Sequence, residues 1–244
     1  MSTHKGERMD PDAYMLPPLL PGRLIKRYKR FLADICLDSG ETVTAHCPNS
    51  GSMKGCAEPG CPVWLSVSDN PRRKLKYTWE LIKTPASMIG INTLVPNRLV
   101  KKAIENHMIS ELNGYSQVRS EVKTSEGTRL DLVLENAGED RCYVEIKNCT
   151  LVEDGTAMFP DAVTLRGQKH LDELMHLVKT GHRGVIFYLI QRMDALRFTP
   201  AARIDQQYAE KLREASDNGV EIVTRDVQID LERIRINHPV PFVL

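Results

Sequence analysis

Two short strands decide the fold: RLDLVL at residues 129–134 and CYVEIK at residues 142–147. Side chains along a strand alternate between its two faces. We therefore expect Asp131 on one face of the first strand. In the second strand we expect Glu145 and Lys147 to share one face. The opposite faces are aliphatic and hold Leu130, Leu132, Leu134, Val144 and Ile146. If the strands pair as a hairpin, two carboxylates and one ammonium group meet on one side of the sheet.

Two carboxylates this close repel each other unless a cation lies between them, which suits a hard divalent ion such as Mg²⁺ or Mn²⁺. The backbone carbonyl of Ile146 would be a third oxygen ligand. Lys147 would hold an attacking water or a phosphate oxygen. The alternative is a solvated ion network across the two strands, with no catalytic role.

Two similar patterns are set aside. A second E-x-K, at residues 121–123, has no Asp on a strand before it. Pro160-Asp161 follows the E-x-K motif instead of preceding it. We therefore interpret only the hairpin residues as a site.

The pattern on both sides of the hairpin predicts an α/β domain. Apolar residues at helical spacing run from Pro96 to Leu112, and a strand at residues 117–123 precedes the hairpin. A helix at 166–179, a buried strand at 184–191, a helix capped by Asp205 and a strand at 220–224 follow it. The expected domain spans residues 85–244.

Residues 16–84 read as five short strands separated by Gly- and Pro-rich joints, at 19–25, 31–37, 41–46, 62–68 and 77–83. This pattern predicts a small barrel of the oligonucleotide/oligosaccharide-binding (OB) kind, and an SH3-like barrel fits nearly as well. Residues 1–15 are polar and without periodicity, so we interpret them as a mobile extension.

Charge is distributed unevenly along a chain of 244 residues whose formal net charge is only +1. Residues 18–83 carry 11 Lys and Arg against 6 Asp and Glu, and residues 84–244 carry 20 against 23. A basic barrel beside a carboxylate-bearing domain suggests a polyanionic partner. No apolar run approaches the roughly 20 residues of a membrane span, so no membrane partner is expected.

Six cysteines in a chain without a secretory signal favour free thiols and a cytoplasmic location. Zinc held by Cys47, Cys56, Cys61 and His46 is the less favoured alternative.

Two basic clusters in the barrel are interleaved with aromatic residues, a combination that suits a groove for DNA phosphates and bases. The alternative is an ordinary solvated face. The candidate DNA-binding residues are Arg23, Lys26, Arg27, Lys29 and Arg30 in the first cluster, and Arg72, Arg73 and Lys74 in the second.

Two further segments are candidates for phosphate contacts. The start of the helix after the hairpin offers unpaired N–H groups beside Arg166, Gln168, Lys169 and His170, or else these residues cover a surface face. The loop HCPNSGSM at residues 46–53 either presents backbone N–H groups to a phosphate or is an ordinary turn.

Several stretches of the sequence, among them the two hairpin strands and the first basic cluster, resemble the sugar fermentation stimulation protein family. The resemblance runs from about Leu16 to Val223 and is carried by residues 22–34, 46–53, 129–131, 144–148 and 159–171. It implies an N-terminal OB-type domain, a C-terminal PD-(D/E)XK nuclease-like domain, and DNA binding with little sequence preference. Leu130 stands where the broad nuclease pattern has a proline before Asp131.

Two functions follow as expectations. The first is Mg²⁺-dependent phosphodiester hydrolysis, with Asp131 and Glu145 as metal ligands and Lys147 orienting the nucleophile. The second is a non-specific DNA-binding regulator of sugar metabolism that does not cleave. A sugar-sensing regulator is a weaker third interpretation, and a homodimer is a further expectation.

Overall fold

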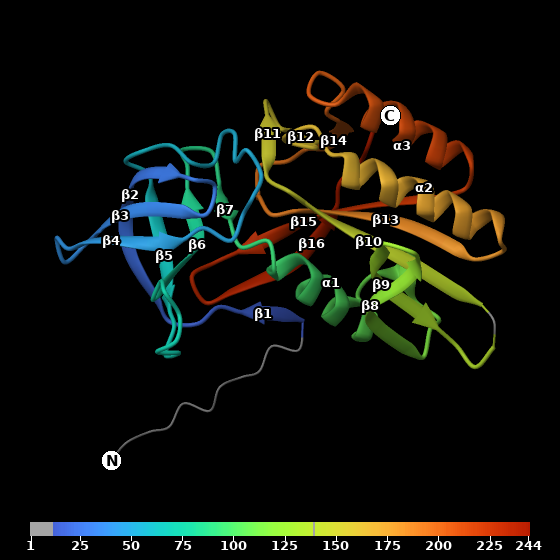
Figure 1. Cartoon of the computed structure of the whole chain (residues 1–244), viewed down its shortest axis with the longest axis horizontal. Coiled ribbons are helices and arrows are strands. Elements are labelled where there is room, and N and C mark those ends of the chain that lie inside the picture. Colours follow the sequence, from blue (N-terminus) through green and yellow to red (C-terminus); the bar gives the residue numbers. More distant parts are fainter. Residues whose placement is uncertain (1–11, 139) are drawn as a thin grey trace, which may run out of the picture.

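The protein has a barrel at one end and a larger α/β domain at the other (Figure 1). This computed structural model describes residues 12–138 and 140–244. The barrel consists of β2 (Leu19–Tyr28), β3 (Leu32–Leu37), β4 (Thr42–His46), β5 (Pro62–Val67) and β6 (Tyr77–Lys83). The strand order is β4-β3-β2-β5-β6, and a parallel β4–β6 pairing closes the barrel. The predicted five-stranded OB-like barrel is confirmed.

The barrel strands form because their side chains alternate between the interior and solvent. In β3 and β4 every second residue is buried. Leu24, Ile35, Val63, Leu65 and Trp79 fill the interior. The indole N–H of Trp79 donates to the carbonyl of Leu81 at 3.0 Å, so its polar atom is satisfied within the core. A short strand, β7 (Met88–Gly90), continues the sheet beyond β6.

The α/β domain is built on a seven-stranded sheet with the order β1-β16-β15-β13-β10-β9-β8. Its members are β1 (Ala13–Met15), β8 (Gln117–Ser125), β9 (Thr128–Glu135), β10 (Arg141–Cys149), β13 (Arg183–Ile190), β15 (Glu221–Ile229) and β16 (Arg233–Pro239). The central strands β10, β13 and β15 are parallel, whereas β8 and β9 form the expected antiparallel meander.

Helices cover both faces of this sheet (Figure 1). Helix α1 (Val95–Glu105) packs one apolar core against one face, and α2 (Leu165–Lys179) with α3 (Gln206–Asp217) packs a second core against the other. Thr164 caps α2 by accepting from Gly167 N at 3.0 Å, and Asp205 caps α3 as predicted. No helix among the described residues is long and apolar enough to cross a bilayer.

Several elements differ from the sequence expectations. Residues 13–15 form β1 against β16, so they are not a loose extension, while residues 1–11 lie outside the described part. The last predicted strand extends to Ile229 and is followed by β16. The small sheet of β11 (Leu151–Glu153), β12 (Thr156–Phe159) and β14 (Arg197–Pro200) was not predicted. Strands this short carry little periodic signal.

The first helix is also shorter than predicted. It ends at Glu105, and residues 110–112 form a separate 3₁₀ turn. Ile109 and Leu112 nevertheless pack in the same core as α1. The apolar spacing therefore predicts correctly that Ile109 and Leu112 are buried, but it does not reveal that the helix ends before them.

Candidate active site

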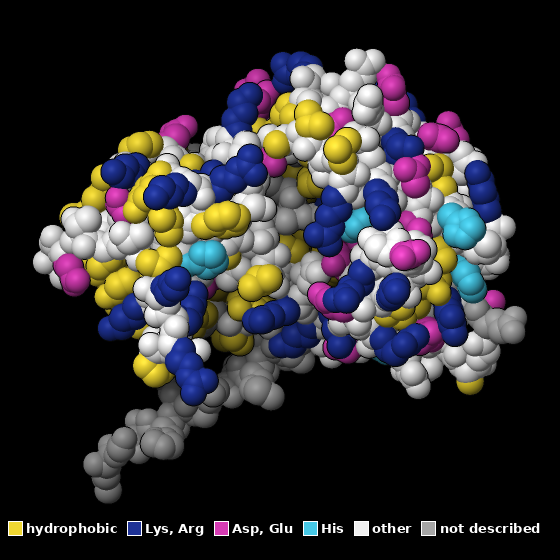
Figure 2. Space-filling view, in the orientation of Figure 1, with side chains coloured by type: hydrophobic (Ala, Val, Ile, Leu, Met, Phe, Trp, Pro, Cys, Tyr) yellow, Lys and Arg dark blue, Asp and Glu magenta, His cyan; other side chains and the backbone are white. Residues whose placement is uncertain are grey.

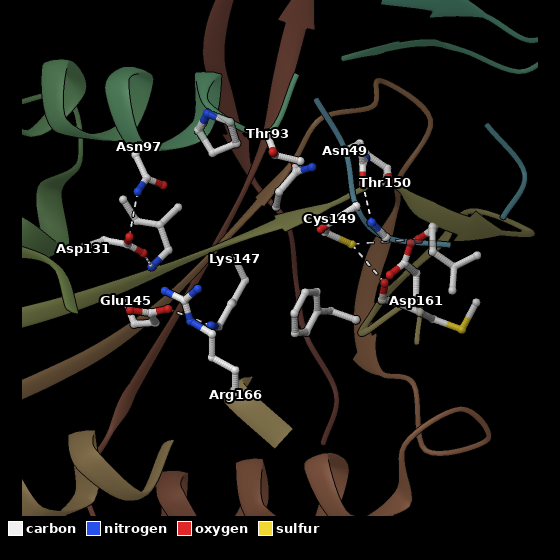
Figure 3. Close-up of a pocket in the computed structure, with 18 residues that line it drawn as sticks. Asn49, Thr93, Asn97, Asp131, Glu145, Lys147, Cys149, Thr150, Asp161 and Arg166 are labelled. Atoms are coloured by element: carbon white, nitrogen blue, oxygen red, sulfur yellow. Dashed lines mark hydrogen bonds and ion pairs between the residues drawn. The ribbon is translucent and has the colours of Figure 1, made fainter. Parts of the chain in front are cut away.

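The surface is hollowed between the barrel and the α/β domain (Figure 2). At the bottom of this hollow a cavity of about 340 Å³ is lined by Asp131, Glu145, Lys147 and Arg166. Figure 3 shows the four side chains directed toward one another. The hairpin residues singled out in the sequence thus share one cavity.

Asp131 on β9 is held by two donors. Its Oδ2 accepts from the backbone N–H of Ile146 at 2.8 Å, and its Oδ1 accepts from the amide of Asn97 on α1 at 2.7 Å. Burial and the nearby charge of Glu145 raise the pKa of Asp131 to about 6. The two carboxylates therefore interact unfavourably when both are ionised.

Glu145 on β10 is almost fully buried, with an exposed fraction of 3%. Its Oε1 accepts from Lys147 Nζ at 2.7 Å and also contacts Nδ1 of His170 on α2. Burial raises the pKa of Glu145, but the neighbouring Lys147 and His170 outweigh burial and lower it below its ordinary value. Its second oxygen, Oε2, is buried and has no hydrogen-bond partner. A buried carboxylate oxygen without a partner is costly and calls for a ligand.

Asp131 lies at an interruption in β9. The pairing of β9 with β10 extends as far as Leu132, and the pairing with β8 skips Asp131. Across that gap Glu121 has a left-handed backbone with φ 57°. Leu130 consequently packs with Val133 under α2 and α3, not beside Leu132 as predicted. That prediction was wrong, because strict alternation holds only along an undistorted strand.

The donor set fits a divalent ion of the Mg²⁺ type. Mg²⁺ sites in proteins use one or two carboxylates and keep several waters, which substrate phosphates can replace. Asp131, Glu145 and the backbone of Ile146 all line the cavity, and Glu145 Oε2 is unpartnered. Among the described residues no cluster of three His, Cys, Asp or Glu side chains could form a complete protein cage. The same finding leaves His46 and the barrel cysteines without a zinc site in the described part of the chain.

A barrel loop also enters the cavity. Asn49, Ser50 and Gly51 line it from the side opposite α2. Thr93, just before α1, donates to the carbonyl of Pro48 at 2.5 Å. On the other side Asp161 accepts from Ser52 Oγ at 3.2 Å and from Met53 N at 3.0 Å. We call residues 48–53 the barrel loop.

Arg27 on β2 holds the barrel loop through hydrogen bonds to its backbone. Its guanidinium donates to the carbonyls of Asn49, Gly51 and Ser52 and to that of Arg30, at 2.8–3.2 Å. Three of these four acceptors belong to the barrel loop, so Arg27 fixes the loop beside the carboxylates.

The other basic barrel residues lie at different places on the surface. Lys29 and Arg30 form the exposed turn between β2 and β3, both with left-handed backbone. Arg23 donates to the carbonyl of Gly60, and Lys26 pairs with Asp34 at 3.6 Å. Arg72, Arg73 and Lys74 belong to the β5–β6 connection and do not line the carboxylate cavity.

Two of the four candidate residues on α2 face the cavity, and the other two point away from it. Arg166 lines the cavity, and one turn later His170 contacts Glu145 and lies 3.3 Å from Lys147 Nζ. Gln168 instead donates to Asp205 at the start of α3, and Lys169 donates to the carbonyl of Gly127. Residues four apart share one side of a helix, whereas their neighbours point elsewhere.

The sequence interpretation does not identify three residues of the cavity: Asn97, Asn148 and Asp161. Asn97 follows Pro96 in the first turn of α1, a position that carries no catalytic signal. Asp161 follows the E-x-K motif, on the side where the motif pattern expects no acid. The two residues reach the cavity through contacts between distant segments, which spacing along the chain does not reveal.

Fold and site together define a two-domain protein with an N-terminal OB barrel and a C-terminal α/β domain whose D…E-x-K residues line a cavity between the two. Residues 94–233 match the model for the sugar fermentation stimulation protein RE domain, and residues 25–91 match that for the SfsA N-terminal OB domain. The chain belongs to the sugar fermentation stimulation protein family.

Relatives resemble the chain over nearly its whole length. A sugar fermentation stimulation protein homolog of Geotalea daltonii is 54% identical, covering 95% of this chain and 100% of the relative. That of Geotalea uraniireducens is 58% identical, covering 90% and 94%. A solved structure of Pyrococcus furiosus SfsA in complex with Ca²⁺ is 25% identical and has a TM-score of 0.87, covering 96% of this chain and 99% of that one.

Proposed function

We propose that this protein is a Mg²⁺-dependent nuclease that binds DNA with little sequence preference and hydrolyses its phosphodiester bonds. One observation carries the proposal: Glu145 Oε2 is buried without a partner, in the cavity that also holds Asp131 and Lys147. With no protein donor on it, this oxygen is available to a bound cation, an arrangement that fits a purely structural ion network less well. The related structure with Ca²⁺ supports a divalent ion in this family.

Asp131, Glu145 and the carbonyl of Ile146 would hold the ion, which supplies Lewis-acid polarisation of the scissile phosphate when bound. Asn97 and the N–H of Ile146 fix the orientation of Asp131. His170 keeps Glu145 in place from α2.

Two cationic groups act on the substrate. Lys147 donates toward an attacking water or a non-bridging phosphate oxygen and stabilises the charge that develops at phosphorus. Arg166 approaches the cavity from the first turn of α2 and would hold the same phosphate. Water attacks phosphorus, the P–O bond to the leaving oxygen breaks, and that oxygen takes up a proton.

Purified protein incubated with plasmid and with single-stranded DNA tests the proposal. Cleavage is expected with Mg²⁺ or Mn²⁺ and not with chelator, and Lys147→Ala should lower the rate about 100-fold or more. The second E-x-K provides a matched control, because Lys123→Ala removes the lysine of the same motif at a position that does not line the cavity. Intact DNA with every metal, together with normal gel retardation, would favour the non-cleaving DNA-binding regulator.

A further inference from the structure

We propose that the substrate of this site is an unpaired DNA strand lying in a groove between the two domains. The inference rests on the proposed nuclease function and adds the strandedness of the substrate. It starts from two hollows that adjoin the carboxylate cavity.

The first hollow lies beside α1, has a volume of about 300 Å³ and shares Asn97 and Asp131 with the carboxylate cavity. The second lies beside the β2–β3 turn, has a volume of about 420 Å³ and shares Gly51 and Asp161 with it. The three hollows therefore adjoin one another, and the carboxylates lie in the middle one. We call this row of hollows the interdomain groove.

Each end of the groove combines a free cation with an exposed aliphatic side chain. At the α1 end these are Arg98 and Leu94, and Leu94 has an exposed fraction of 60%. At the other end they are Arg30 and Val163, and Val163 is 67% exposed. Neither arginine side chain has a hydrogen bond or ion pair with another described residue. The cations suit phosphates, and the aliphatic groups suit an apolar ligand surface.

A DNA duplex offers little such surface, because the faces of its bases are stacked inside and only base edges are open in its grooves. An unpaired strand exposes the apolar faces of its bases, on which side chains can pack. Leu94 and Val163 would therefore bury more apolar surface against a single strand than against a duplex. Phosphates alone would account for Arg98 and Arg30 but not for these two.

The shape of the groove argues in the same direction. Glu145 is 3% exposed and lies at the bottom of a cavity of about 340 Å³. The barrel loop beside it is fixed by Thr93 on one side and by Asp161 on the other. A duplex is stiff, with a persistence length of about 150 base pairs, so bending it into such a space costs deformation energy. A flexible single strand enters without that cost.

The test compares the affinities of one labelled oligonucleotide, free and annealed to its complement, by fluorescence anisotropy in Ca²⁺. We expect the single strand to bind at least tenfold more tightly. Leu94→Ser with Val163→Ser should weaken single-strand binding about tenfold and change duplex binding less than twofold. Leu196→Ser is the matched control, because Leu196 is 77% exposed and lies outside the groove. It should change neither affinity.

Equal or tighter binding of the duplex overturns the inference, and so does a double variant that loses both affinities alike. Cleavage of duplex as fast as of single strand would also overturn it, while leaving the nuclease function intact. Absence of cleavage by the wild-type protein on any DNA overturns the nuclease function instead, and the anisotropy comparison still decides which strand the groove accepts.

Discussion

At the residue scale, the carboxylate pair is held in an arrangement that is unfavourable without a cation. Asp131 is fixed by two donors and Glu145 by Lys147 and His170, so neither can turn away to relieve the repulsion. Burial first, and the charge of Glu145 second, raise the pKa of Asp131 to about 6. Keeping the two acids ionised at these positions therefore costs the metal-free protein stability.

Replacing Asp131 by Asn should therefore stabilise the metal-free protein. The substitution removes one buried charge, and a pKa shift of this size corresponds to roughly 1–3 kcal/mol. Thermal unfolding in chelator should show a higher Tm, whereas the increase in Tm that Mg²⁺ gives the wild type should disappear. Glu121→Gln, at an exposed position, should leave both values unchanged. A Mg²⁺ response that survives in the Asp131 variant would place the ion elsewhere.

Variants of two arginines of the first basic cluster, Arg27 and Arg30, should distinguish an effect on folding from an effect on DNA binding. Arg27→Ala removes the donors for the barrel-loop carbonyls and should lower the unfolding free energy by about 1–3 kcal/mol in urea titrations. Arg30→Ala leaves those bonds in place. It should instead weaken DNA binding and reduce the slope of log K against log salt by about one. A normal Tm in the Arg27 variant would contradict this division.

At the element scale, the barrel loop is the segment that joins the domains at the site. It is anchored at Pro48 by Thr93 and at Ser52 and Met53 by Asp161. Asp161 in turn precedes α2, the helix that carries Arg166 and His170. A displacement of the loop is therefore transmitted to both walls of the cavity.

Gly51→Ala tests this coupling. A Cβ at residue 51 would lie 2.6 Å from a carboxylate oxygen of Asp161, so the loop and Asp161 must move apart. We expect faster amide hydrogen exchange at residues 49–53 and a lower cleavage rate, with the Mg²⁺ effect on Tm retained. Gly55→Ala is a useful comparison: it lies outside the loop with open space around its Cβ, although its φ of 73° adds local strain. Unchanged exchange in the Gly51 variant would show that the hydrogen bonds from Ser52 and Met53 to Asp161 do not hold the barrel loop.

At the scale of the whole molecule, the two domains share apolar packing. Leu81 belongs to the barrel strand β6, yet it is fully buried in the core between α1 and the large sheet. Trp64 and Met88 of the barrel pack against that same core. Ile91 N donates to Glu80 O, and Gly90 N donates to Gln191 O, which ties the connection to both domains.

Leu81→Ala should accordingly destabilise the whole chain and not the barrel alone. The cavity it leaves should lower the unfolding free energy by about 2–5 kcal/mol. Calorimetry should show one transition for wild type and variant alike, because neither domain keeps an intact core without the other. Two separated transitions would mean that the domains unfold independently.

Particular residues show how far the sequence alone reached. The barrel strands, the hairpin, the Asp205 cap and the triad of Asp131, Glu145 and Lys147 all follow from local periodicity. Period-two and period-3.6 patterns report burial, and burial decided these elements. The three-stranded sheet was missed because strands of three or four residues depend on their partners more than on their own pattern. The seven-residue strand β16 lies between β1 and β15 and carries an alternating Arg-Ile pattern that the sequence interpretation did not use.

What the sequence determined by itself is therefore the barrel strands, the hairpin with its chemistry and the three helices, since these are encoded within a few neighbouring residues. Only the tertiary structure decided that Arg27 supports a loop, that Leu130 changes sides, and that Asp161 joins the site. The bonds from Ser52 and Met53 to Asp161 span 109 and 108 residues of chain. Contacts over such separations arise from how the domains pack, and no local spacing records them.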